Sequence, residues 1–392
     1  MNHIFIFNII LGISTVTFLL YCLKLHVTTY WEKNYYFLPI FTFIIKFVFV
    51  IYFYLASVDG GLHDAHTFYY KPVDYYPFKL GNHVVLNLGY FIRSELYISY
   101  FNANLLLSIL SFVGLHFLLM CASSYYKKKK IDYYFVIFFF PSIHFWSIGF
   151  AKETFVFFSM SLLCYKIFQQ QRISILYLII ILLPVILVRP HYTIFFVFAA
   201  FLYNLLISNK KKKDLLILIS SLSLGLYLLI MSLDLQTTGS LFNLNLDDLK
   251  KFIAIRQNEN PSQTMEFEFR EYNILELTLR FIYFPNILDI FKVEMISTQF
   301  LLLVENTILL LLTIKIVKRI FKIKDSKITK SSYILICFII LFALSASLIT
   351  ANLGIVFRYK NLIYPIFIIM LFLVYKKKKK RNETYLKFTE TN

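Results

Sequence analysis

The chain has 392 residues, of which 59% are hydrophobic and 16% are charged, and its formal net charge is +18. A mean hydropathy of +0.67 excludes a soluble protein with a single apolar core and indicates an integral membrane protein. The basic excess does not indicate nucleic-acid binding, because much of it lies at 127–130, 210–213 and 376–381, in runs that abut apolar segments and mark the cytoplasmic side of a membrane.

Apolar runs along the chain predict about eleven membrane-spanning helices, since a hydrocarbon layer requires roughly 20 apolar residues per helix. The first run is long enough to remain as a helix instead of being removed as a signal. If the basic connections lie inside, the amino terminus lies outside. The expected spans lie near 5–23, 37–56, 102–123, 131–148, 150–167, 173–188, 192–208, 215–232, 298–314, 332–350 and 361–375.

The pair of expected spans between 131 and 167 is interrupted. Pro141 and the polar stretch 142–153 break the apolar pattern there. Proline with nearby polar residues also suits one broken or re-entrant helix that lines a cavity. In both interpretations the middle of the segment faces outward.

Two expected outside connections are long, at 57–101 and 232–297. The second contains an amphipathic segment at 246–256 that is typical of a surface helix. The predicted fold is therefore an all-α polytopic membrane protein with two larger outside loops, forming one integral membrane domain over 1–392. The four cysteines lie in apolar runs and predict neither disulfides nor a metal cluster.

Polar residues, most of them ionisable, occur in four connections that this topology places outside. Such groups near membrane depth are costly and indicate a functional site. We therefore expect the four connections to form one site. The residues are Asp59, His63, Asp64 and His66 in the first loop, His144, Lys152 and Glu153 in the 142–153 turn, Arg189 and His191 in VRPHYT, and Asn352, Arg358 and Lys360 in ANLGIVFRYKN. Glu305 and Asn306, inside the ninth span, are expected to satisfy each other and neighbouring helices.

A carboxylate beside several cations suits glycosyl transfer from a lipid-linked pyrophosphate. Asp64 is the expected base, and the expected catalytic residues also include Asp59 and His191. The arginine forks can each bind two phosphate oxygens. The expected substrate-binding residues are Arg189, Arg358, Lys152, Glu153 and His144. Structural roles stay open: Asp59 in a turn, Asp64 at a helix start, and the arginines as headgroup anchors. The histidines do not have convincing metal-ligand spacing.

Several segments resemble those of a known group of membrane enzymes. The acidic residue in GLHDAHTFYY is similar to the loop-one acidic motif of GT-C glycosyltransferases. FPSIHFWSIGFAKE, VRPH and NLGIVFR resemble segments of bacterial polysaccharide-assembly membrane proteins, including Wzy-type O-antigen and capsule polymerases. One departure is that the arginine-x10-glycine pattern of some polymerase loops does not occur at Arg189, Arg256 or Arg270.

The resemblance implies a multi-pass, GT-C-like enzyme of the bacterial inner membrane that needs neither metal nor cofactor. It would transfer a growing glycan from undecaprenyl pyrophosphate onto an incoming repeat unit. The implied partners are the lipid-linked oligosaccharide, membrane lipids and a chain-length regulator protein, without nucleic acid.

Three alternatives remain open. They are a GT-C enzyme that adds one sugar from a polyprenyl-phosphate donor, a transporter of lipid-linked glycans, and an acyltransferase that uses HDAH. A transporter is expected to show internal repeats or charges at mid-membrane depth, and the sequence indicates neither.

Overall fold

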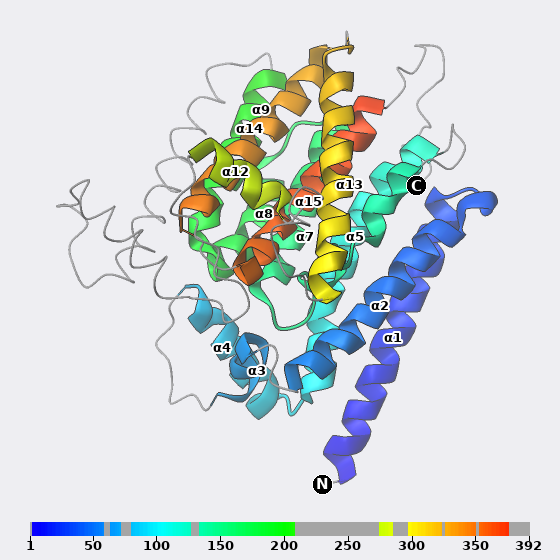
Figure 1. Ribbon diagram of the computed structural model, residues 1–392. Helices are drawn as coiled ribbons and strands as arrows, with labels where there is room; N and C mark the ends of the chain where they lie inside the picture. The colour runs from blue at the N-terminus through cyan, green and yellow to red at the C-terminus, as the bar shows by residue number, and fades with distance from the viewer. Residues whose placement is uncertain are drawn as a thin grey trace, which may run out of the picture.

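The computed structural model describes residues 2–58, 63–71, 80–126, 133–207, 274–284, 297–323, 326–349 and 353–375, and within these ranges all regular structure is helical (Figure 1). Six of the described helices are long and apolar enough to cross a membrane. The chain is thus a helical membrane protein. The expected span 215–232 and the amphipathic segment 246–256 lie outside the described residues.

Nine of the expected spans correspond to helices in the described part of the chain. Six are the long helices α1 (Asn2–Tyr30), α2 (Phe37–Val58), α5 (Tyr100–Tyr126), α13 (Ser297–Ile320), α14 (Ser326–Ile349) and α15 (Leu353–Tyr375). Three are shorter: α7 (Lys152–Gln169), α8 (Ile175–Val188) and α9 (Thr193–Ile207). Helix α15 begins well before the expected start at 361, so Arg358 and Lys360 lie within a helix and not in a connection.

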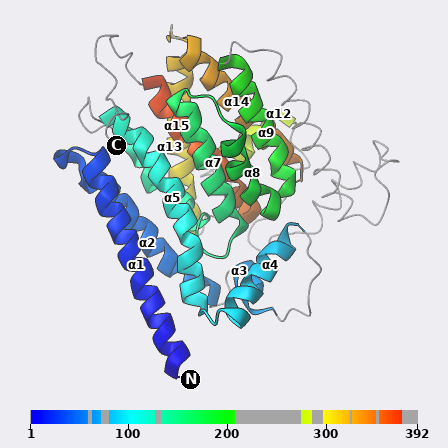
Figure 2. The ribbon, with the colours of Figure 1, turned by 180° about the vertical axis from the view of Figure 1, so that it is seen from behind.

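Helix α7 lies inside the bundle and packs against α5, α8 and α15. Helix α15 is also central, because its sequence from 361 to 374 is apolar on nearly every side and all of these residues are buried. Helix α1 stands at the margin in both ribbon views (Figures 1 and 2). Its exposed residues include Phe5, Ile10 and Leu20, as expected for a helix that faces lipid.

The segment 133–151 is broken, which corrects the expectation of a separate span at 131–148. It forms a 3-10 helix (η3, Tyr133–Phe139) and a five-residue α-helix (α6, Pro141–Phe145), followed by a turn into α7. The break occurs at Phe140, whose extended backbone is the conformation that a following proline favours. Phe138, Phe140 and Ile143 are buried, so protein and not lipid surrounds this irregular backbone.

The two expected outside loops also contain helices. The first loop forms α3 (His63–Tyr70) and α4 (Asn82–Tyr90), followed by a π-helical turn (η2, Phe91–Glu95). Helices α3 and α4 lie together at the lower end of the bundle in Figure 1. In the second loop, α12 (Ile274–Tyr283) packs against α14 and α13 and buries Phe281 and Ile282.

Candidate functional site

Five of the predicted site residues come together where α3 approaches α7, α8 and α15. We call Asp64, Lys152, Glu153, Arg189 and Arg358 the charged cluster. Two ion pairs hold it: Arg358 Nη1 lies 2.6 Å from Asp64 Oδ2, and Arg189 Nη2 lies 2.6 Å from Glu153 Oε1. Lys152 interacts electrostatically with all four of the other charges. These five residues, which come from distant parts of the chain, therefore lie together in the structure.

The pair between Asp64 and Arg358 is open to solvent. The side chain of Asp64 is 62% exposed and that of Arg358 is 27% exposed. The Arg358 guanidinium also lies 5.1 Å from the ring centroid of Trp146, at the end of α6. An exposed ion pair contributes about 0–1 kcal/mol, so a competing anion can replace the carboxylate at low cost.

The pair between Glu153 and Arg189 is buried, with side chains only 10% and 17% exposed. The guanidinium of Arg189 also lies over the rings of Tyr192 and Tyr359, at 5.8 and 5.6 Å. Burial by itself would lower the pKa of Arg189, but Glu153 and the two tyrosines raise it above its usual value, so Arg189 stays charged. Burial lowers the pKa of Lys152 to about 7. When Lys152 is protonated, the charged cluster has three cations against two carboxylates, and its excess positive charge then suits an anionic ligand.

The turn before α7 fixes where Lys152 and Glu153 stand. Asn104 Oδ1 on α5 accepts a hydrogen bond from the Phe150 amide at 2.9 Å, and Ser108 Oγ accepts one from the Gly149 amide at 3.0 Å. Gly149 has a φ of 65°. A Cβ there would overlap the side chains of Asn104 and Phe53, so glycine is required for both its conformation and its size.

Helix α3 presents Asp64 and Phe68 on one face, one helical turn apart. Asp64 meets Arg358, while the Lys152 ammonium lies 5.4 Å from the ring centroid of Phe68. The position of α3 is fixed by the hydroxyl of Tyr69, which donates to the Ile98 carbonyl. Burial raises the pKa of Tyr69 to about 12, so this donor keeps its proton at physiological pH.

The structure places two other predicted residues away from the charged cluster. His144 is fully buried in α6, where its ring pairs with the Phe138 carbonyl at 2.7 Å and stacks on Phe49. Lys360 is also buried, and its ammonium donates to Asn306 Oδ1 at 3.0 Å. Asp59 and Asn352 lie outside the described residues, as do the side chains of His63 and His191.

Charged residues inside the bundle are more numerous than the sequence indicated. Lys46, Glu305 and Lys360 lie within candidate spans and are at most 3% exposed. Glu305 and Asn306 bond to neighbouring helices as expected: Glu305 accepts hydrogen bonds from Ser142 and Tyr364, and Asn306 Oδ1 accepts one from the Lys360 ammonium. Lys46 went unrecognised because one lysine in an apolar run leaves the run long enough to span. The expectation of no charge at mid-membrane depth is therefore wrong.

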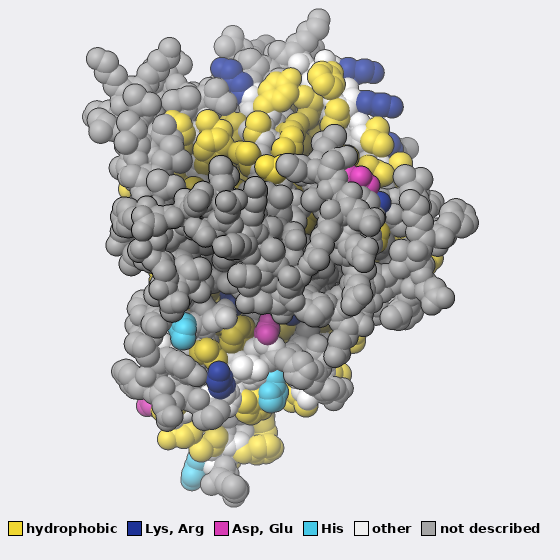
Figure 3. Space-filling model, turned by 60° about the vertical axis from the view of Figure 1, so that its left-hand side comes forward, with side chains coloured by type: hydrophobic (Ala, Val, Ile, Leu, Met, Phe, Trp, Pro, Cys, Tyr) yellow, Lys and Arg dark blue, Asp and Glu magenta, His cyan; other side chains and the backbone are white. Residues whose placement is uncertain are grey.

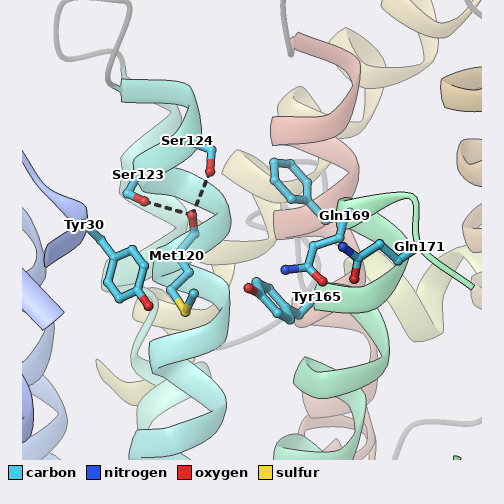
Figure 4. A pocket seen from close by; sticks show the side chains of 8 residues that line it. Tyr30, Met120, Ser123, Ser124, Tyr165, Gln169 and Gln171 are labelled. Atoms are coloured by element: carbon cyan, nitrogen blue, oxygen red, sulfur yellow. Dashed lines mark hydrogen bonds between the residues drawn. The ribbon is translucent and has the colours of Figure 1, made fainter. Parts of the chain in front are cut away.

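A pocket of about 390 Å³ lies at the other end of α7 (Figure 4). None of its lining residues is charged, so it does not suit a pyrophosphate. They are Tyr30, Met120, Ser123, Ser124, Tyr165, Phe168, Gln169 and Gln171.

In the space-filling view, Lys and Arg side chains stand at the upper margin, while acidic, basic and His side chains occur together in the lower part (Figure 3).

Comparison with protein-family models, curated proteins and solved structures gives no match to this chain. The described residues hold no group of three His, Cys, Asp or Glu side chains that could bind a metal ion. The chemistry of the charged cluster is therefore the basis for a functional proposal.

Proposed function

We propose that this protein is a glycosyltransferase that polymerises lipid-linked oligosaccharide repeat units on the outer face of the bacterial inner membrane. The observation that carries the proposal is the convergence of Asp64 with Arg358 and Lys152 at one end of a helical membrane bundle. Lys166, in the last turn of α7, and Arg172, in the connection after it, lie at the opposite end of α7, which the positive-inside rule assigns to the cytoplasm. A GT-C-like architecture of about eleven membrane crossings, with the broken segment 133–151 as one of them, is part of the proposal.

The cluster offers the groups that the reaction needs. The Asp64 carboxylate takes the proton from the acceptor hydroxyl as its oxygen bonds to the anomeric carbon of the donor glycan. The bond from that carbon to the pyrophosphate breaks, and undecaprenyl pyrophosphate leaves with the electron pair. Arg358 and Lys152 stabilise the negative charge that develops on the leaving group.

The two arginines have different roles in this proposal. Glu153 and two tyrosine rings hold Arg189 in place, so Arg189 contributes a fixed positive potential. Arg358 is more exposed and binds the pyrophosphate directly, because only an exposed pair separates readily. Binding of the pyrophosphate to Arg358 also releases Asp64 to act as a base.

The test is the surface-glycan ladder of a strain from which this gene is deleted, with and without a complementing copy. A polymerase predicts collapse of the ladder to a core that bears a single repeat unit. An intact ladder with altered mobility would contradict the proposal and favour a single-sugar or acyl transferase. Loss of the single unit would also contradict it and favour a transporter, a class that the buried charges of Lys46, Glu305 and Lys360 keep in consideration.

A further inference from the structure

Helix α6 has a charged side chain from a distant part of the chain at each end. Glu305 of α13 accepts hydrogen bonds from the Ser142 amide at 2.9 Å and from the Ser142 hydroxyl at 2.6 Å, in the first turn of α6. Lys46 of α2 lies at the other end, where its Nζ donates to the carbonyls of Ile143 at 3.4 Å and His144 at 3.3 Å. A helix end leaves amides free at its start and carbonyls free at its end, so an acceptor at the first end and a donor at the second match the free groups of α6.

The surroundings of Lys46 match a protonated amine. Its third partner is Ser147 Oγ. The Ser147 hydroxyl itself donates to the Ile143 carbonyl, so towards Lys46 it acts as an acceptor. Three acceptors around one nitrogen correspond to the three donors of an ammonium group. The Phe157 ring, 5.3 Å from the nitrogen, adds a favourable cation–π contact.

Helix α6 in turn supports the charged cluster. Trp146 is its C-terminal cap, and the Trp146 amide donates to the Ser142 carbonyl at 3.2 Å. The Arg358 guanidinium lies over the Trp146 ring in a cation–π contact. Lys152 follows Trp146 by six residues in the chain. Ser147, which bonds to Lys46, also accepts a hydrogen bond from the Ser111 hydroxyl of α5 at 3.1 Å. The short helix thus connects the two buried charges to both cations of the proposed pyrophosphate site.

We infer that Lys46 and Glu305 are positioning residues that hold α6 from its two ends and thereby set the place of Trp146 under Arg358. Neither touches the charged cluster itself. Their effect on glycan synthesis rests on the proposed function, whereas their effect on Trp146 does not. The structural part of the inference can therefore be tested without any assay of activity.

The first test uses tryptophan fluorescence, because the chain has only two tryptophans. In a Trp31→Phe background Trp146 is the only tryptophan, and it can be excited at a wavelength where the tyrosines do not absorb. Replacing Lys46 by methionine keeps an unbranched side chain only one atom shorter but removes all three donors. We expect a red-shifted Trp146 emission and stronger quenching by acrylamide. The matched control is Thr42→Val, one turn away on α2, since the buried Thr42 hydroxyl bonds only to the Leu38 carbonyl among the contacts described for it.

An unchanged Trp146 spectrum in folded Lys46→Met protein, or an equal change in Thr42→Val, would overturn the inference. If Lys46→Met does not fold, two milder variants take its place. Ser147→Ala removes one acceptor of Lys46, and Ser142→Ala removes the hydroxyl donor to Glu305 while keeping the amide. Each should shift the Trp146 emission in the same direction, and an absence of shift in both would again overturn the inference.

The glycan ladder then separates this inference from the proposed function. A shifted spectrum with a shortened ladder supports both. A shifted spectrum with a normal ladder, in a strain where Asp64→Asn is also normal, supports the positioning role and contradicts polymerisation at the charged cluster. A shifted spectrum with a normal ladder where Asp64→Asn is defective overturns only the link from α6 to activity.

Discussion

At the residue scale, the two ion pairs of the charged cluster have the same 2.6 Å separation but different burial. Desolvation of the Glu153–Arg189 pair makes the loss of one partner costly, because the other charge then stays buried without compensation. Water already surrounds much of the Asp64–Arg358 pair, so either partner can be lost with little effect on folding. Stability and activity should therefore respond differently to mutations in the two pairs.

Replacing Asp64 by asparagine should abolish chain extension and leave the fold intact. The amide cannot accept the proton of the acceptor hydroxyl, and loss of an exposed pair should cost less than about 1 kcal/mol of unfolding free energy. The ladder and a thermal unfolding curve measure the two effects. Glu95→Gln, at another exposed carboxylate of the first outside loop, is the control. Normal polymer from Asp64→Asn would exclude Asp64 as the base.

Replacing Glu153 by glutamine should instead lower the unfolding temperature. Removal of one partner of a buried pair costs about 3–5 kcal/mol. The control is Glu276→Gln, since Glu276 pairs with Arg280 on α12 but its side chain is 41% exposed. Equal stability losses in the two variants would mean that the burial of Glu153 has no energetic consequence.

Replacing Arg358 by lysine should weaken binding of the lipid-linked donor. Lysine keeps the positive charge but lacks the planar fork that binds two phosphate oxygens. We expect the apparent KM for the lipid-linked donor to rise more than kcat falls, measured with purified enzyme in vesicles. Arg189→Lys is the comparison, because Arg189 contacts Glu153 and not the ligand in this proposal. A larger KM effect at Arg189 would reverse the roles of the two arginines.

Topology was enough to predict the charged cluster. The five ionisable residues were expected at the same end of the bundle, and the area of that end is small, so their side chains were expected to lie close together. Topology could not separate Arg358 from Lys360. Residues two apart on an α-helix point about 200° from each other. Once α15 begins at Leu353, Arg358 faces Asp64 while Lys360 faces Asn306. Which of the two residues faces Asp64 depends on whether 353–360 is helical, and the sequence around 351–360 does not predict where the helix begins.

At the element scale, α3 and α4 make a close backbone contact at Gly89. A Cβ on Gly89 would overlap the carbonyl oxygen of Phe68, which lies on the same face of α3 as Asp64. The separation of the two helices therefore controls how far Asp64 reaches towards Arg358. Pattern analysis gave no signal for this contact, because a glycine within an apolar stretch has no distinctive periodicity.

Gly89→Ala should therefore reduce both stability and polymerisation. Forcing the two helices apart should cost about 1–3 kcal/mol, the usual range for overpacking a buried position. Thermal unfolding and the ladder measure the effects, with Asn82→Ala at an exposed position of α4 as the control. If Gly89→Ala were destabilised but fully active, the spacing of α3 and α4 would have no influence on Asp64.

The break at 133–151 could be foreseen as an alternative, since Pro141 and the polar residues after it interrupt the apolar run. The form of the break, a 3-10 helix followed by the short helix α6, could not be predicted. The hydrogen bonds that hold α6 come from Lys46 and Glu305, which are far away in sequence. Long-range partners of this kind leave no local pattern.

At the scale of the whole molecule, the charged cluster and the uncharged pocket lie at opposite ends of α7. The helix is about 27 Å long, close to the thickness of a hydrocarbon layer. Nine of the expected spans could be located from apolar runs and basic connections. The packing of α7 and α15 at the centre could not, because apolar runs look alike whether they face lipid or protein.

Cysteine labelling should place these ends on opposite sides of the membrane. In a variant without the four native cysteines, a cysteine at Glu95 should react with an impermeant maleimide in intact spheroplasts. A cysteine at Gln171, exposed between α7 and α8, should react only after the membrane is opened. The opposite result would invert the topology and contradict a site on the outer face.

Asp64 and Arg358 are 294 residues apart in the chain. Membrane proteins enter the bilayer segment by segment as they are synthesised, so Asp64 is in place long before its partner exists. The charged cluster is completed only when α15, the last described helix, has been inserted. If the charged cluster is the proposed polymerase site, a polypeptide that ends early would carry the Asp64 carboxylate without Arg358 and would not be an active enzyme.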